Sequence, residues 1–115
     1  MARKRMRGRI QLKETLNVYD AKTGKLVGRL VDISDMGIQL GCKKLIPEHT
    51  FIKLRLELPE VINDMDSLEF DAISTWNRTD APKSYAVGFQ MLNITPQDIN
   101  TLLKVVEKYK AEEEE

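Results

Sequence analysis

The chain has 115 residues, the usual length of one domain and enough to bury a hydrophobic core. Its 18 basic and 18 acidic residues balance, and its single cysteine, Cys42, excludes an internal disulfide and fits a reducing compartment. No apolar run approaches the about 20 residues that a membrane-spanning helix needs, and no apolar stretch of a secretion signal follows the basic start. We therefore expect a cytoplasmic protein without membrane insertion.

The charge is concentrated at the two ends of the chain. Residues 1–9 contain five basic side chains and no acidic one, whereas Glu112 to Glu115 are all acidic. A basic end attracts an anion, and an acidic end is most simply a solvated tail.

The first expected element is a β-hairpin over residues 12–33. A run with Leu16, Val18 and Tyr19 and a second run, Leu26 to Ile33, rich in Val, Leu and Ile, flank Asp20 to Gly24, where Asp opens a turn and Gly permits a positive φ. A short strand from Ile38 to Leu40 is expected next, and Pro47 marks the loop after it.

Three later segments alternate apolar and polar residues, which is typical of antiparallel strands with one wet face. They cover residues 50–58, 67–77 and 84–92. We expect Pro59 to end the first of them, Asn63-Asp64 to form the next connection, and residues 77–82 to turn into the third. In the second segment the alternation assigns one inward face to Leu68, Phe70, Ala72, Ser74 and Trp76.

The period changes from two to helical after residue 94. Thr95 fits an N-cap, Pro96 the first helical position, and Asp98 completes a Thr-x-x-Asp start. An apolar stripe follows at helical spacing: Ile99, Leu102, Leu103, Val106 and Tyr109. We expect the stripe to pack on the strands, with a partner-binding face as the alternative. The strand count, five to seven, predicts a barrel or a sandwich.

Patterns of catalytic residues do not emerge. His49 has no second His or Cys spaced to share a metal, and the Gly24 to Gly28 segment lacks the spacing and the helix of a phosphate loop. Cys42 has no activating His beside it and is expected to be a buried apolar residue. We predict a protein that is not an enzyme and holds no metal.

Two segments carry the chemistry of a binding site. The arginines of residues 5–9 can bind phosphate in bidentate fashion and match the O6 and N7 edge of guanine. Asp32 and Ser34 lie two apart at a strand end and so share a face, where they can accept and donate hydrogen bonds. Gly37 permits a close approach. Either segment alone is more often a solvated tail or a simple turn.

Together the two segments resemble the PilZ family, whose signature is Arg-x-x-x-Arg followed by Asp/Asn-x-Ser-x-x-Gly. Arg5 and Arg9 match the first motif, and Asp32, Ser34 and Gly37 match the second. The Val18 to Gly28 hairpin, Trp76, the Val87 to Phe89 run and the closing helix are similar to the family as well. Arg3 and Arg7 also satisfy the first motif; we prefer Arg5 and Arg9 because apolar Ile10 follows. Lys4 departs from an arginine that is common in the family.

The resemblance implies a mostly β fold: a six-stranded antiparallel β-barrel of the Greek-key, split-barrel type with a C-terminal α-helix. Residues 1–11 would form a basic ligand-binding arm, 12–94 the barrel, and 95–115 the helix and acidic tail. It also implies a receptor for cyclic di-GMP, the bacterial second messenger. Such a receptor would change conformation and act through a protein effector, as yet unidentified, on motility, adhesion or polysaccharide production.

Carried over residue by residue, the resemblance gives each motif residue a role. Arg5 and Arg9 would grip phosphates and guanine edges, Asp32 and Ser34 would hydrogen-bond a guanine, and Gly37 would leave room for it. The secondary ligand-binding residues would be Lys4, Arg7, Trp76 and Asn77, although core packing is the first reading of Trp76.

Two alternatives remain open from the sequence. One is a PilZ-like adaptor that binds proteins but no nucleotide. The other is a small nucleic-acid-binding barrel that uses the basic arm. The second would need exposed aromatic residues for stacking, and most aromatic residues here alternate onto inward faces, which argues against nucleic acid as a partner.

Overall fold

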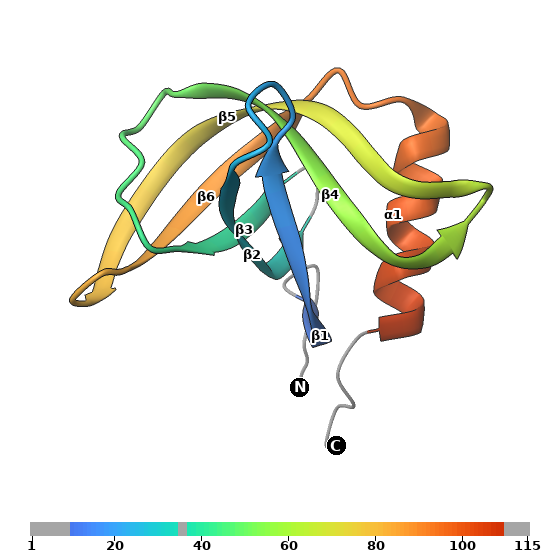
Figure 1. The fold of residues 1–115 in the computed structure, drawn as a ribbon, viewed down its shortest axis with the longest axis horizontal. Helices are drawn as coiled ribbons and strands as arrows, with labels where there is room; N and C mark the ends of the chain where they lie inside the picture. The colour runs from blue at the N-terminus through green and yellow to red at the C-terminus, as the bar shows by residue number, and fades with distance from the viewer. Residues whose placement is uncertain (1–9, 35–36, 110–115) are drawn as a thin grey trace, which may run out of the picture.

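The computed structural model describes residues 10–34 and 37–109. They form, in chain order, β1 (Ile10–Asp20), β2 (Leu26–Ser34), β3 (Gly37–Cys42), β4 (Phe51–Ile62), β5 (Met65–Ala81), β6 (Ser84–Leu92) and α1 (Pro96–Tyr109) (Figure 1). The strands are antiparallel and close into a barrel in the order β1-β2-β3-β6-β5-β4. The predicted six-stranded barrel with a C-terminal helix is confirmed.

The turn between β1 and β2 forms as its residues predict. The Asp20 carboxylate accepts the backbone N–H groups of Lys22 at 2.8 Å and Thr23 at 3.2 Å. Gly24 then takes a φ of 77°, which a residue without a β-carbon adopts at little cost. This local chemistry fixes the first hairpin.

Two strands are longer than their sequence predicts. β4 continues through Pro59 to Ile62, because the β4–β5 ladder is already interrupted between Glu57 and Ile62 and proline removes no ladder hydrogen bond there. Asn63 and Asp64, with φ of 54° and 65°, form the expected connection. β5 likewise runs to Ala81 instead of turning at residue 77. The predictions that Pro59 ends a strand and that residues 77–82 form a turn are therefore wrong.

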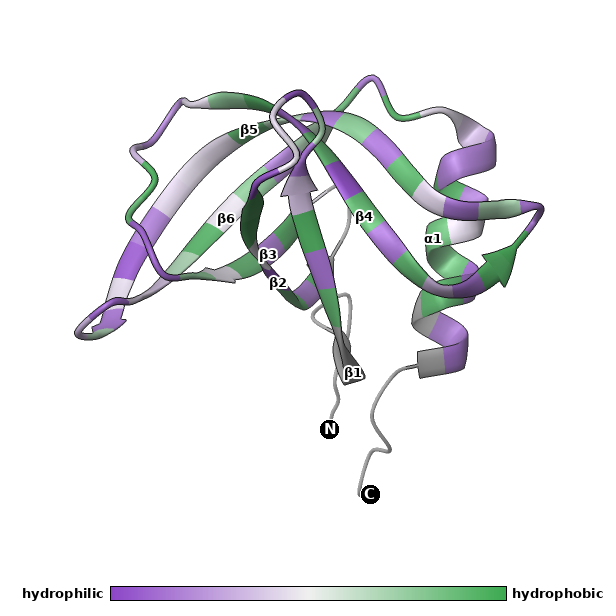
Figure 2. Cartoon of the chain, in the orientation of Figure 1, coloured by the Kyte–Doolittle hydropathy of each residue, from purple (hydrophilic) through white to green (hydrophobic). Residues whose placement is uncertain are grey.

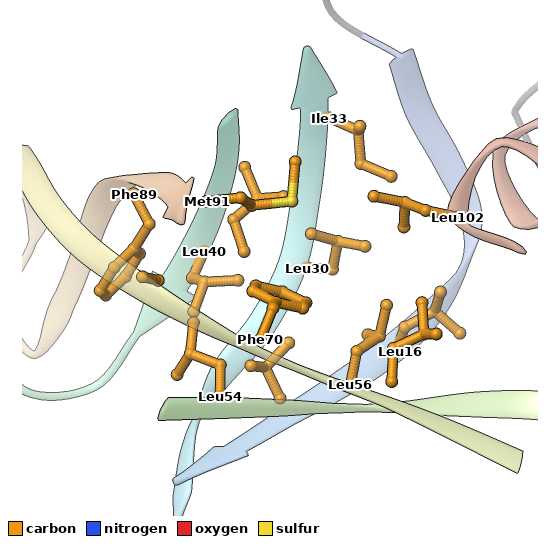
Figure 3. Packing of buried hydrophobic residues seen from close by; sticks show 14 of the residues in the cluster. Leu16, Leu30, Ile33, Leu40, Leu54, Leu56, Phe70, Phe89, Met91 and Leu102 are labelled. Carbon is orange, nitrogen blue, oxygen red and sulfur yellow. The ribbon is translucent and has the colours of Figure 1, made fainter. Parts of the chain in front are cut away.

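One face of each strand fills the barrel, and the alternation of hydrophilic and hydrophobic residues along β4 and β5 is visible in Figure 2. Side chains from all six strands and the helix form one buried cluster (Figure 3). Its largest fully buried members include Leu40, Leu54, Leu56, Leu68 and Val105.

Helix α1 begins as predicted, because Thr95 Oγ1 accepts the backbone N–H of Asp98 at 3.1 Å. Leu102 and Val105 join the barrel core, and α1 contacts β1 and β4. Leu103, expected in the packed stripe, is 59% exposed, because the buried face is centred on Leu102 and Val105. The side chains of Val106 and Tyr109 lie outside the described part. Across the residues described, no helix is long and apolar enough to cross a membrane.

Candidate ligand-binding face

The strand register brings the second sequence motif and Trp76 into one row. Asp32 on β2 pairs with Gln39 on β3, Gln39 pairs with Gly88 on β6, and Gly88 pairs with Trp76 on β5. Three steps between strands at about 4.8 Å each span about 14 Å. Next to this row, Ser34 pairs with Gly37 at the connection between β2 and β3.

A β-bulge decides which way Asp32 faces. Leu30 pairs with Leu40 and Asp32 pairs with Gln39, so two steps on β2 match one step on β3. Leu30 and Ile33 both belong to the core, and the residue between the bulge and Ile33 therefore lies on the outer side. Asp32 is only 5% exposed, so this outward carboxylate is still well covered.

A second bulge corrects the prediction for Trp76. Ser74 pairs with Phe89 and is fully buried, but Trp76 pairs with Gly88, one position along β6 instead of two. The extra residue turns Trp76 onto the outer side of the barrel, where it is 37% exposed. The expectation that Trp76 packs in the core is wrong.

The Trp76 indole lies directly on the backbone of Gly88. A β-carbon at position 88 would be 2.0 Å from Trp76 Nε1 and 2.3 Å from Cε2. The guanidinium carbon of Arg78 lies 5.7 Å from the centroid of the Trp76 ring, within the range of a cation–π contact. These contacts with Gly88 and Arg78 position the indole on the outer side of the sheet.

A parallel row carries two more guanidinium groups that sequence reasoning did not single out. Gly41 pairs with Ala86, and Ala86 pairs with Arg78. Arg29 lies over Gly41, because a β-carbon there would be 2.8 Å from Arg29 Nη1. Arg29 and Arg78 thus flank a floor of small residues. The sequence shows an arginine on one expected strand and a glycine directly after another. Only the strand register of the fold shows that the two residues lie opposite each other.

The charge on Arg78 is shared with a neighbour. Arg78 Nε donates to Asp80 Oδ1 at 2.6 Å, and this hydrogen bond holds the pKa of the Asp80 carboxyl below its usual range. The same bond raises the pKa of Arg78. Both side chains are exposed, Arg78 at 57% and Asp80 at 45%, so solvent screens the ion pair and it contributes little to stability.

Asn77, predicted as a secondary ligand residue, is engaged with the loop between β3 and β4. Its Nδ2 donates to the Ile46 carbonyl at 3.1 Å. Ser74 holds the same loop, since its hydroxyl donates to the Pro47 carbonyl at 2.6 Å and accepts the Thr50 N–H at 2.8 Å. Sequence reasoning missed this role of Ser74. The signal was a hydroxyl in an otherwise apolar inward series, because buried polar groups are hydrogen-bonded.

The remaining predicted residues fall in two groups. Asp32, Ser34 and Gly37 come together where β2 meets β3, although the side chain of Ser34 is not among those described. The arm residues Arg3, Lys4, Arg5, Arg7 and Arg9 lie outside the described residues. Within residues 10–34 and 37–109, no group of three or more His, Cys, Asp or Glu side chains is placed to hold a metal ion.

The PilZ domain model matches residues 3–108, and the chain belongs to the PilZ domain family. This is a family of ligand-binding and adaptor domains. The match includes both arginine pairs considered above and the β2–β3 motif.

Several solved structures are similar to this chain, and two of them show the shared fold. One is the inhibitor of motility MotI/DgrA from Bacillus subtilis, with a TM-score of 0.68 and 17% sequence identity, covering 93% of this chain and 52% of that one. This chain therefore spans about half the length of the Bacillus protein. The other is the PilZ domain of YcgR from Escherichia coli, solved with c-di-GMP, with a TM-score of 0.68 and 15% identity, covering 93% and 92% of the two chains. No curated protein matches the chain.

Proposed function

We propose that this chain is a cytoplasmic receptor for cyclic di-GMP, which binds on the outer face of β2, β3, β6 and β5. The observation that carries the proposal is the row from Asp32 through Gln39 and Gly88 to Trp76, next to the pairing of Ser34 with Gly37. A PilZ domain of the same fold has been solved with this dinucleotide.

The chemistry of the row suits a guanine nucleotide. A carboxylate at Asp32 accepts the N–H groups of a guanine edge, and charge-assisted hydrogen bonds of this kind are strong. Trp76 offers an exposed ring on which a base can stack, and such stacking contributes about 1–3 kcal/mol per base. Arg5 and Arg9 would bind the phosphates, because a guanidinium group binds phosphate in bidentate fashion.

Binding of the ligand would change the conformation of the basic arm, residues 1–11. Ordering a residue costs about 1–2 kcal/mol, and each hydrogen bond to a charged group contributes about 1.5–3 kcal/mol, so several arginine–phosphate contacts offset the cost of ordering. The rearranged surface would then be read by a protein effector that controls motility, adhesion or polysaccharide production.

Calorimetric titration with cyclic di-GMP, beside GTP as a control ligand, tests the proposal. We expect Arg9→Ala and Asp32→Asn each to remove most of the binding heat. Arg55→Ala is the matched control, because Arg55 stacks on Tyr19 at 5.0 Å in the β1–β4 part of the barrel and should bind as the parent does. Parental affinity in the Arg9 and Asp32 variants, or no binding by the parent, would refute the site and favour an adaptor that recognises only proteins.

A further inference from the structure

The barrel has an open mouth at the ends of β2 and β3 far from the Ser34–Gly37 pair. A cavity of about 750 Å³ lies there, between the β1–β2 turn, the β3–β4 loop and the β5–β6 turn. We call it the basic mouth. Its lining includes Lys25, Val27, Gly28, Gly41, Lys43 and Lys83.

The floor of the basic mouth is apolar. Val27, Ile46 and Ile52 are half-buried and pack against the barrel core, and Leu26 at the strand end is 57% exposed. Gly28 lets β2 and β3 approach closely beneath the floor, since a β-carbon there would lie 2.5 Å from the Gly41 carbonyl oxygen. Covering apolar surface of this kind with a ligand removes it from water and favours binding.

The rim is cationic. Lys25, Arg29, Lys43, Lys44 and Lys83 are all exposed and come from three separate turns and strand ends. The lining contains one carboxylate, Asp20, and its Oδ1 accepts two backbone N–H groups in its own turn. The formal net charge of the chain is zero, so this rim is a local concentration of positive charge rather than part of a basic protein.

We propose that the basic mouth binds an anionic amphiphile, with its apolar chain on the floor and its carboxylate or phosphate on the lysines. The volume falls within the about 300–1,000 Å³ of pockets for small molecules, in which apolar contacts give affinity and a few polar groups set orientation. The lysine ammonium group, a point charge on a flexible side chain, can neutralise such an anion. The described lining holds no aromatic ring for stacking, which distinguishes this site from the Trp76 face and disfavours a nucleobase.

The residues that carry the proposed nucleotide site do not line the basic mouth, although Arg29 and Gly41 of the neighbouring row do. Along β2 the mouth involves residues 26–29, whereas the nucleotide site involves Asp32 and Ser34, and along β3 it involves Gly41 and Cys42 rather than Gly37. Binding at the mouth therefore stands or falls independently of cyclic di-GMP.

An NMR titration of the full chain with decanoate locates the site. We expect the amide signals of Val27, Gly28, Gly41 and Cys42 to shift in a saturable way at decanoate concentrations below those that form micelles. Decan-1-ol has the same chain without the charge, and acetate has the charge without the chain; each should bind at least about tenfold more weakly, which corresponds to about 1.4 kcal/mol. Equal binding of decanoate and decan-1-ol would overturn the role of the rim.

Two variants test the rim and the cavity by different means. The double variant Lys43→Glu/Lys44→Glu should weaken decanoate binding at least about tenfold, again about 1.4 kcal/mol. Lys104→Glu/Lys108→Glu makes the same charge change on α1 and should leave the affinity unchanged. Ser84→Trp places a bulky ring in the mouth without changing charge and should also block decanoate. Circular-dichroism melting curves of these variants give a control for intact folding.

Three results would overturn the proposal. The first is no saturable shift at the mouth with decanoate. The second is an equal loss of affinity in the α1 control. The third is binding of a glutamate-rich peptide at the mouth in place of decanoate, which would make it a protein-docking site. Co-sedimentation with phosphatidylglycerol vesicles separates a free amphiphile from a lipid headgroup; we expect none, and rim-dependent sedimentation would contradict a free ligand.

Discussion

The contact between Trp76 and Gly88 leads to a sharp prediction, because a single methyl group removes it. The β6 backbone is paired on both sides, with β3 and with β5, so it cannot retreat from the ring. A β-carbon 2.0 Å from Nε1 is far inside van der Waals distance. In Gly88→Ala the indole must therefore swing away from the sheet into solvent.

The cost of this change can be worked out from the lost contacts. A tryptophan side chain buries about 150–250 Å² when it is covered, and Trp76 is about two thirds covered. If the ring gives up about 60 Å², the loss at about 25 cal/mol per Å² is about 1.5 kcal/mol. The cation–π contact with Arg78 adds about 0.5 kcal/mol. We expect Gly88→Ala to lower the free energy of unfolding by about 2 kcal/mol.

Trp76 is the single tryptophan of the chain, so its fluorescence reports on the contact directly. We expect a red shift of its emission in Gly88→Ala and a lower urea midpoint. Gly41→Ala is the matched control on the neighbouring strand, because its β-carbon crowds only the flexible end of Arg29 and meets Val31 Cγ2 at 3.4 Å, an ordinary van der Waals distance. In a Trp76→Ala background, Gly88→Ala should cost almost nothing. Unchanged emission, or an equal cost in that background, would refute the reasoning.

Other contacts give further expectations. Ser74→Ala should lower the free energy of unfolding by about 1–3 kcal/mol, because the half-buried N–H of Thr50 loses its acceptor; an unchanged denaturation midpoint would contradict this. Thr95→Ala should cost about 1 kcal/mol by removing the acceptor of the Asp98 N–H, whereas Thr95→Ser should keep it; equal circular-dichroism melting curves would exclude the cap. Burial raises the pKa of the Cys42 thiol to about 11, so iodoacetamide at pH 8 should modify it slowly until urea unfolds the chain; fast modification of the folded protein would argue against burial.

The strands were predictable where local alternation decides the answer. Leu54, Leu56, Leu68 and Phe70 face inward as their spacing predicts, because a strand presents every second residue to the same side. Trp76 breaks the rule because its pairing partner on β6 is shifted by one residue. A bulge depends on two strands that are distant in sequence, so the period of one strand cannot predict it.

The same limit applies to the candidate site. The motif around Asp32 and Gly37 could be predicted because its residues lie close together in the sequence. Arg29 and Arg78 could not, because exposed arginines on strands resemble any solvent-facing residue until the register places them beside Gly41 and Ala86.

The seam between β1 and β4 is the shortest part of the barrel closure. Its ladder extends only from Val18–Leu56 to Asp20–Leu54, and beyond it α1 supplies Leu102 and Val105 to the shared core. We therefore expect the backbone amide hydrogens of the β1–β4 ladder to exchange faster than those of the other ladders. The start of β1 follows directly on the arginine arm. A nucleotide that binds the arm and a protein that binds α1 would thus both act on the β1–β4 ladder, one through the start of β1 and the other through the helix.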